Sequence, residues 1–278
     1  MVANSGLAST PSGSNSGPVK LHASVEGEGS PLVLLHGLFG MGSNLGGISR
    51  ALSDVYEVHQ LDLPNHGRSS WTEDMNFAAL AASIRAYIAN ACDGRAAVLG
   101  HSLGGKVAMQ LAMDFPDAVS QLVLADIAPV PYQPSHGSVF AAIESLATEP
   151  PASRRDAAER MREHLQEEAV VQFLLLSLRR AEDGHYRWRF NARGLRDSYA
   201  QLLEAPREGS YPGPTLFVYG ALSSYVDEGG SKAARRRFPA AEFVSIGDTG
   251  HWLHAEKPTE FNASVRNFLL RYTNRVSA

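Results

Sequence analysis

Predominantly apolar runs of four or five residues recur along the chain, and most of them end at a glycine or an aspartate. The clearest runs cover residues 31–35, 96–99, 121–125, 215–219 and 242–246. Strands that are apolar on both faces are typical of a parallel sheet covered by helices on either side. The pattern therefore predicts buried strands in a mostly parallel central sheet.

Longer segments with helical spacing lie between these runs, for example residues 76–91 and 106–115. Residues 19–26 and 56–63 alternate between apolar and polar positions, which predicts two further strands at the start of the sheet. Strands that alternate with helices along the chain are the signature of an α/β protein. We therefore expect helices on both faces of the sheet.

The alternation stops between about residues 129 and 214, where the pattern predicts three or four helices and no strand. The expected helical segments are 153–168, 170–178 and 194–203, the first of which is heavily charged. A helical insertion after a sheet strand predicts a cap over the carboxyl edge of the sheet, where open α/β sheets bind ligands.

The predicted domain organisation has three parts. Residues 1–18 are rich in Ser, Gly, Asn and Ala and are expected to form a disordered tail. Residues 19–130 and 212–278 form the expected core, and residues 131–211 form the expected helical cap.

Composition narrows the possible partners and the location. The 278 residues carry a formal net charge of −4, which gives no reason to expect nucleic acid or an anionic membrane surface as a partner. No run approaches the roughly 18 apolar residues of a membrane span, and the first residues lack the features of a secretory signal. A cytoplasmic location is expected, and the oligomeric state stays open. The single cysteine, Cys92, excludes an intramolecular disulfide and is expected to be a bystander on a helix.

The segment Gly100-His-Ser102-Leu-Gly104 matches the pattern G-x-S-x-G, and it lies between an apolar strand and a predicted helix. In that context the serine occupies a strained strand-to-helix turn, because a side chain at either flanking position would collide with neighbouring backbone. The helix N-terminus that follows favours developing negative charge. Ser102 is therefore the predicted nucleophile of a serine hydrolase.

A serine hydroxyl needs a base to take its proton, and in this architecture the chain order is serine, acid, histidine. Of the ten histidines, His251 follows the last predicted strand and would lie in a loop at the carboxyl edge of the sheet. It is the predicted base. His254, one turn further on, is expected to be a packed or supporting histidine.

A second glycine-containing loop, His36-Gly-Leu38-Phe-Gly40, follows the strand at residues 31–35. Glycines there let the backbone approach a substrate and turn its N–H groups inward. The N–H groups of Leu38 and Leu103 are the predicted oxyanion-hole donors. The polar turn at residues 62–69 is interpreted as scaffold for this loop, with His66 in a structural role.

Signals for other chemistries are absent from the sequence. It contains no G-x-x-x-x-G-K-[ST], no paired cysteines and no H-E-x-x-H, so neither a cofactor nor a metal is expected.

With these motifs in this order, the chain resembles the α/β-hydrolase superfamily over nearly all of residues 19–272. A narrower resemblance, to short-chain acyl esterases and thioesterases that include small bacterial esterases and mitochondrial abhydrolase-domain proteins, is carried by six segments in order. They are His36-Gly-Leu-Phe-Gly40, Asn65-His-Gly67, Gly100-His-Ser-Leu-Gly-Gly-Lys106, Asp126-Ile-Ala-Pro-Val130, Trp188-Arg-Phe-Asn191 and Gly250-His-Trp-Leu-His-Ala-Glu-Lys-Pro258. The resemblance implies an α/β-hydrolase fold with a small helical cap, a Ser–His–Asp triad, no cofactor, and hydrolysis of carboxylic or thioester acyl groups.

The acid of the triad is less direct to assign. Much of the superfamily places it about three residues past the glycine that ends the penultimate strand, and here that position is Ser223, which cannot serve. Some members place it at the end of the strand after the nucleophile helix, which is Asp126 here. We favour Asp126 over Asp227, the next acid after Ser223, and rank Asp248 last.

The sequence thus predicts an esterase that acts through an acyl-enzyme on small-molecule esters of short to medium acyl chains, with thioesters as a further candidate substrate. Five aromatic residues are candidates for the substrate pocket, although the cap residues among them could equally form the cap's own core: Phe39, Phe140, Phe173, Trp188 and Trp252. A perhydrolase, lactonase or carbon–carbon bond hydrolase with the same triad is one alternative. A ligand-sensing protein on a hydrolase scaffold, with little turnover, is another.

Overall fold

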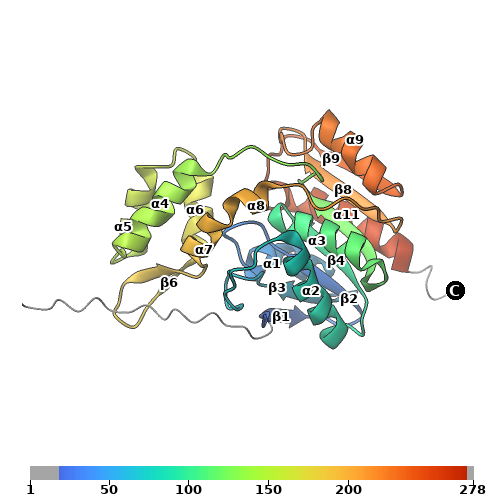
Figure 1. The fold of residues 1–278 in the computed structure, drawn as a ribbon, viewed down its shortest axis with the longest axis horizontal. Coiled ribbons are helices and arrows are strands. Elements are labelled where there is room, and N and C mark those ends of the chain that lie inside the picture. Colours follow the sequence, from blue (N-terminus) through green and yellow to red (C-terminus); the bar gives the residue numbers. More distant parts are fainter. Residues whose placement is uncertain (1–18, 274–278) are drawn as a thin grey trace, which may run out of the picture.

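The structure, a computed structural model, describes residues 19–273, so the predicted tail at residues 1–18 lies outside the described residues. The described chain forms a seven-stranded sheet in the order β1-β3-β2-β4-β5-β8-β9 (Figure 1). Strand β1 runs antiparallel to β3, and all other neighbours in the sheet are parallel. The strands are β1 (Ala23–Glu26), β2 (Ser30–Leu35), β3 (Tyr56–Leu61), β4 (Ala96–His101), β5 (Val119–Ala125), β8 (Thr215–Gly220) and β9 (Ala241–Ile246). The predicted mostly parallel sheet is confirmed.

Helices cover both faces of the sheet, because successive residues of a strand point to opposite sides. In β2, Val33 belongs to a hydrophobic cluster with α2 and α3, whereas Leu34 belongs to a second cluster with α1 and α11. The helices and 3-10 turns that accompany the sheet outside the β5–β8 connection are η1 (Gly42–Leu45), α1 (Gly46–Leu52), α2 (Phe77–Ala91), α3 (Leu103–Asp114), η2 (Pro116–Ala118), α9 (Glu228–Arg237), α10 (Leu253–Glu256) and α11 (Pro258–Thr273). The α/β-hydrolase architecture expected from the sequence is therefore present.

The chain between β5 and β8 forms a separate group of elements, most of which lies to the left of the sheet in Figure 1. Five helices form there, not the three or four predicted, because the expected helix at residues 194–203 divides at Ser198. The elements are α4 (Gly137–Thr148), α5 (Arg154–Arg162), α6 (Glu168–Leu176), β6 (Leu178–Arg180), β7 (Tyr186–Trp188), α7 (Ala192–Asp197) and α8 (Tyr199–Leu203).

The prediction that this insertion contains no strand is wrong. Strands β6 and β7 pair antiparallel, with Leu178 opposite Trp188, both of them buried. The connecting turn uses Gly184 at a φ of 85°, a conformation that glycine adopts without strain. Each strand has three residues, which is too short for an apolar–polar alternation to be recognised in the sequence.

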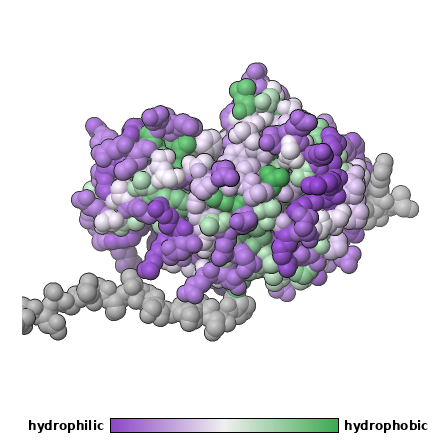
Figure 2. All heavy atoms as spheres, turned by 45° about the horizontal axis from the view of Figure 1, so that its top comes forward, coloured by the Kyte–Doolittle hydropathy of each residue, from purple (hydrophilic) through white to green (hydrophobic). Residues whose placement is uncertain are grey.

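The face shown in Figure 2 is mostly hydrophilic, and its hydrophobic patches are separated from one another. The large hydrophobic side chains that are exposed among the described residues are Val25, Trp71, Leu176 and Leu222. Within residues 19–273 no helix combines the length and the apolar character that crossing a membrane requires.

Candidate active site

Ser102 lies at the turn between β4 and α3, where the backbone is strained. Its φ is 52° and its ψ is −116°, a conformation that a non-glycine residue rarely adopts. A Cβ on Gly100 would lie 2.3 Å from the carbonyl oxygen of Gly104, and a Cβ on Gly104 would lie 2.3 Å from that of Leu35. Both glycines of the motif are therefore required by backbone contacts, and the turn presents the Ser102 side chain at the carboxyl edge of the sheet.

The side chains of His251 and Asp126 come together at the same edge. Asp126 directly follows β5 and is completely buried, and His251 lies in the loop after β9. His251 Nδ1 is 2.6 Å from Asp126 Oδ2, which fits an N–H that donates to a carboxylate. His251 and Ser102 line the same cavity.

Two further donors fix the Asp126 carboxylate. The N–H of Gly220 donates to Oδ1 over 3.0 Å, and the hydroxyl of Ser223 donates to Oδ2 over 2.5 Å. Ser223 is the residue at the position where much of the superfamily carries its acid. Because Ser223 cannot be the acid itself, reasoning from the sequence set it aside and missed this supporting contact.

The other two aspartates considered for the acid have different partners. Asp227 is the N-cap of α9, and its Oδ1 accepts the N–H of Gly230 over 2.6 Å. Asp248 has a side chain that is 91% exposed and pairs with Lys257 Nζ at 3.4 Å. Of the three aspartates, Asp126 is the one that contacts His251.

The loop at residues 36–40 is held by two buried histidines. His36 Nε2 accepts the N–H of Leu63 over 2.9 Å, and His66 Nε2 accepts the N–H of Phe39 over 3.2 Å. On each ring Nδ1 lies next to a carbonyl oxygen, that of Gly37 or that of Pro64, so Nδ1 carries the proton. Burial lowers the pKa of His36 to about 4 and that of His66 to about 3, which keeps both rings neutral and able to accept.

The N–H groups of the two residues that follow Leu38 have hydrogen-bond acceptors on His66 and within the loop. Phe39 and Gly40 donate to His66 and to the Gly37 carbonyl, but among residues 19–273 the N–H groups of Leu38 and Leu103 have no hydrogen-bond acceptor. A Cβ added to Gly37 would lie 3.4 Å from Ser102 Cβ, so the loop approaches the nucleophile closely. Two unsatisfied N–H groups therefore flank Ser102.

Aromatic rings enclose the His251 imidazole. The Tyr225 ring stacks on it with centroids 4.1 Å apart, and the His101 ring lies 4.7 Å away and contacts His254. His101 Nε2 is also 2.9 Å from the His251 carbonyl oxygen. Burial lowers the pKa of His101 well below its ordinary value and that of His254 to about 4. Neutral histidines therefore pack beside His251.

Cys92, the residue that closes α2, is buried, and burial raises the pKa of its thiol to about 11. A raised pKa removes the thiolate that a nucleophile needs. Among the described residues, no group of three or more His, Cys, Asp or Glu side chains could hold a metal ion.

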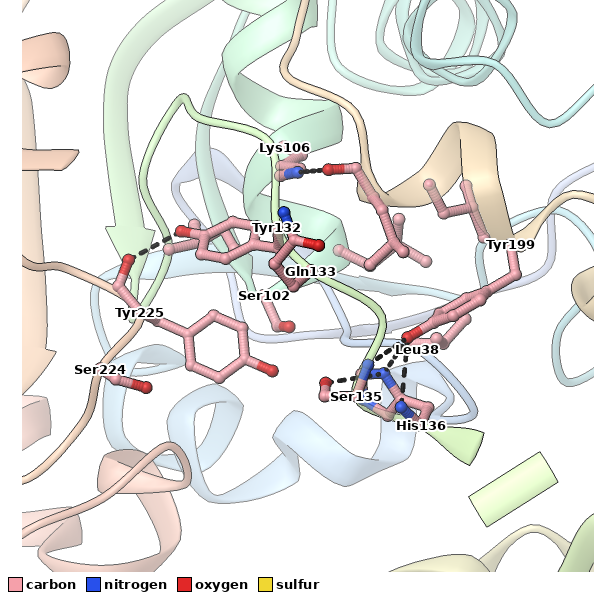
Figure 3. Close-up of a pocket in the computed structure, with 14 residues that line it drawn as sticks. Leu38, Ser102, Lys106, Tyr132, Gln133, Ser135, His136, Tyr199, Ser224 and Tyr225 are labelled. Carbon is pink, nitrogen blue, oxygen red and sulfur yellow. Dashed lines mark hydrogen bonds between the residues drawn. The ribbon is translucent and has the colours of Figure 1, made fainter. Parts of the chain in front are cut away.

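Two cavities meet at Ser102, with volumes of about 390 Å³ and 1200 Å³. The smaller one, shown in Figure 3, is lined by side chains from the insertion as well as from the sheet layer, among them His136 and Tyr199. Of the aromatic residues predicted to form a pocket, Phe39, Phe173 and Trp252 line the larger cavity.

The remaining two predicted pocket residues lie elsewhere. Phe140 and Trp188 are buried within the hydrophobic cluster and line neither cavity. The Trp188 Nε1 donates to the Ile143 carbonyl over 3.0 Å, so its polar atom is satisfied inside the insertion. The structure thus places these two rings in the core of the insertion.

Comparison with known proteins identifies the class to which this fold and site belong. The family described as alpha/beta hydrolase fold matches residues 30–258, and the chain therefore belongs to the α/β-hydrolase family.

Individual relatives within this family are named as esterases and lipases. The chain is 39% identical over 241 residues to Esterase YbfF of Escherichia coli (strain K12), covering 86% of this chain and 93% of the esterase. It is 34% identical over 254 residues to sn-1-specific diacylglycerol lipase ABHD11 of Danio rerio, covering 88% and 80%. A solved structure titled Marine microorganism esterase superposes with a TM-score of 0.86 at 32% identity and covers 90% of this chain and 99% of its own. The enzyme class predicted from the sequence, carboxylic ester hydrolase, is confirmed by these relatives.

Proposed function

We propose that this chain hydrolyses carboxylic esters of short to medium acyl chains through a Ser102–His251–Asp126 triad and an acyl-enzyme. The observation that carries the proposal is the 2.6 Å contact between His251 Nδ1 and the buried Asp126 carboxylate, beside a serine on a strained turn. A histidine oriented in this way presents Nε2 to a nucleophile and is stabilised as imidazolium.

The first step forms the acyl-enzyme. His251 Nε2 takes the proton of the Ser102 hydroxyl as Oγ attacks the ester carbonyl carbon. The N–H groups of Leu38 and Leu103 donate to the oxyanion, which develops at the N-terminus of α3. His251 then gives its proton to the departing alcohol oxygen, and the acyl group stays on Ser102.

The second step repeats this chemistry with water. His251 takes a proton from a water molecule that attacks the acyl-enzyme, and the collapse of the second tetrahedral intermediate returns the proton to Ser102. The products are a carboxylic acid and an enzyme in its starting state. A thioester would follow the same path with a thiol as the leaving group.

The test is Ser102→Ala, assayed with p-nitrophenyl butyrate and with a fluorophosphonate probe. The wild type should turn over the ester and be labelled at Ser102, whereas the variant should do neither and should keep its unfolding temperature. Labelling without turnover, together with a ligand-induced rise in unfolding temperature, would favour the ligand-sensing alternative. Turnover by the Ser102→Ala protein would refute the assigned nucleophile.

The length of the preferred acyl chain is tested by a series of p-nitrophenyl esters. We expect the largest kcat/KM at short to medium chains, as the resemblance to short-chain acyl esterases implies. A maximum at long acyl chains would contradict this part of the proposal.

A further inference from the structure

Lys106 is a buried cation that lines the smaller cavity. It lies in α3 one helical turn, a rise of about 6 Å, beyond Ser102, and residues four apart share one face of a helix. Its side chain is 2% exposed, and it lines the cavity together with Ser102 and Tyr132 (Figure 3).

The ammonium group of Lys106 is only partly satisfied. Nζ donates to the carbonyl oxygens of Leu203 and Glu204, over 2.9 Å and 2.5 Å, and lies 4.6 Å from the centre of the Tyr132 ring. An ammonium has three N–H donors, and among residues 19–273 no carboxylate pairs with this one. A buried charge without an ion-pair partner is costly, and desolvation lowers the pKa of Lys106 to about 7, against a smaller opposing effect of the Glu204 carboxylate.

In the proposed reaction the acyl group and the alcohol of the ester lie on different sides of Ser102. His251 protonates the leaving group, and His251 lines the larger cavity but not the smaller one. Of the two proposed oxyanion donors, Leu38 lines both cavities, whereas Leu103 lines the smaller one but not the larger one. The alcohol therefore leaves through the larger cavity, while the acyl group extends past Leu103 towards Lys106.

We propose that the smaller cavity is the acyl site and that Lys106 selects short acyl chains ending in a carboxylate. The preferred substrates are then monoesters of short dicarboxylic acids. A terminal carboxylate would supply a direct ion-pair partner for the ammonium and accept its remaining N–H. This inference rests on the proposed function, because it assumes that the acyl group is held on Ser102.

The experiment uses matched pairs of substrates. The monoethyl esters of succinic, glutaric and adipic acid are each compared with the ethyl ester of the monocarboxylic acid of equal carbon number. The quantity measured is the ratio of kcat/KM for the charged ester to that for its neutral partner, at pH 6. We expect a ratio above one for at least one pair in the wild type.

Lys106→Met should lower that ratio by about 10-fold or more, the range of a hydrogen bond to a charged group. Lys232→Met is the matched control, since it removes a lysine from α9, outside both cavities, and should leave the ratio as it is. The unfolding temperature and the rate of fluorophosphonate labelling show whether each variant is folded.

A second measurement does not depend on the Met variant folding. Between pH 6 and pH 8.5 the wild-type ratio should fall as Lys106 loses its proton, whereas Lys106→Arg should keep its ratio because a guanidinium stays charged. Two ionisable groups face the ammonium: the carboxylate of Glu204, at the end of α8, and the phenol of Tyr132. Burial raises the pKa of the Tyr132 phenol. Helix α2 contributes the ring of Phe77, which is not ionisable.

The outcomes separate this inference from the function on which it rests. If Ser102-dependent hydrolysis occurs but the ratio is the same in wild type, Lys106→Met and Lys232→Met, the carboxylate preference is wrong and the esterase proposal stands. The carboxylate preference is equally wrong if Lys106→Met lowers the unfolding temperature alone. If no ester in the set is hydrolysed by the wild type, both proposals fall.

Discussion

The assignment of the acid is best tested by replacing one carboxylate oxygen of Asp126 with an NH₂ group. Asp126→Asn keeps the size of the side chain, and its remaining oxygen can still accept the Gly220 N–H at the position of Oδ1. The NH₂ group then occupies the position of Oδ2, facing His251 Nδ1 and the Ser223 hydroxyl. Since NH₂ donates, the imidazole must carry its proton on Nε2, where it can no longer accept the proton of Ser102.

The expected loss can be worked from this change of tautomer. In Ser–His–Asp systems the same exchange lowers kcat by about 10⁴-fold, which corresponds to about 5 kcal/mol of barrier at about 1.4 kcal/mol per tenfold. The matched control is Asp227→Asn. Asp227 caps α9, and asparagine caps a helix about as well as aspartate, so kcat and the free energy of unfolding should change little.

The assay is steady-state hydrolysis of p-nitrophenyl butyrate, with the rate of fluorophosphonate labelling as a measure of Ser102 activation and near-UV circular dichroism as a measure of folding. A folded Asp126→Asn protein that keeps more than about a tenth of wild-type kcat would refute the reasoning, because the required tautomer allows no such rate. A large loss of kcat in Asp227→Asn alone would move the acid to that residue.

Three further predictions concern stability and the parts that hold the site. Ser223→Ala removes a hydroxyl donor from the buried carboxylate and should lower the free energy of unfolding by about 1.5–3 kcal/mol, measured by urea denaturation. Gly104→Ala should cost about 3 kcal/mol or more because its Cβ would lie 2.3 Å from a backbone oxygen, whereas Gly47→Ala, a helical glycine with open space around it, should stabilise by about 0.5–1 kcal/mol. Stability should fall with acid below pH 6.5: the folded-state pKa values of His36 and His66 are lowered to about 4 and about 3, so the unfolded state binds more protons. The free energy of unfolding should then drop by up to about 3 kcal/mol per pH unit, and a flat profile between pH 6.5 and 4 would contradict this.

The features of the candidate site that could be predicted from the sequence are local ones. Gly100, Ser102 and Gly104 belong to a single strand–turn–helix unit, and the collisions that exclude a side chain there involve backbone atoms within or beside that unit. The apolar runs of the sheet could be recognised for a similar reason, since burial on both faces leaves a continuous signal in the sequence. Local requirements of this kind can be recognised in one short stretch of the chain.

Contacts between distant segments could not be predicted in this way. His36 and His66 each accept an N–H from a residue 27 positions away, and no residue pattern encodes such a contact. The buried position of Trp188 depends on a hairpin whose strands have three residues each. An aromatic residue in the insertion therefore gave no indication of whether it would line a cavity or fill the core.

The place of Asp126 follows from the register of two neighbouring strands. Strands β5 and β8 run parallel, with Ala125 opposite Val218, so the chain leaves both strands at the same edge of the sheet. Asp126, one residue past β5, and Ser223, three residues past β8, therefore reach the same point, and their side chains are in contact there. A carboxylate at the end of either strand could therefore reach His251 Nδ1. This explains why the acid of this fold can follow one strand or the next while the histidine keeps its place. The serine at the other position donates to the carboxylate of Asp126, the proposed acid.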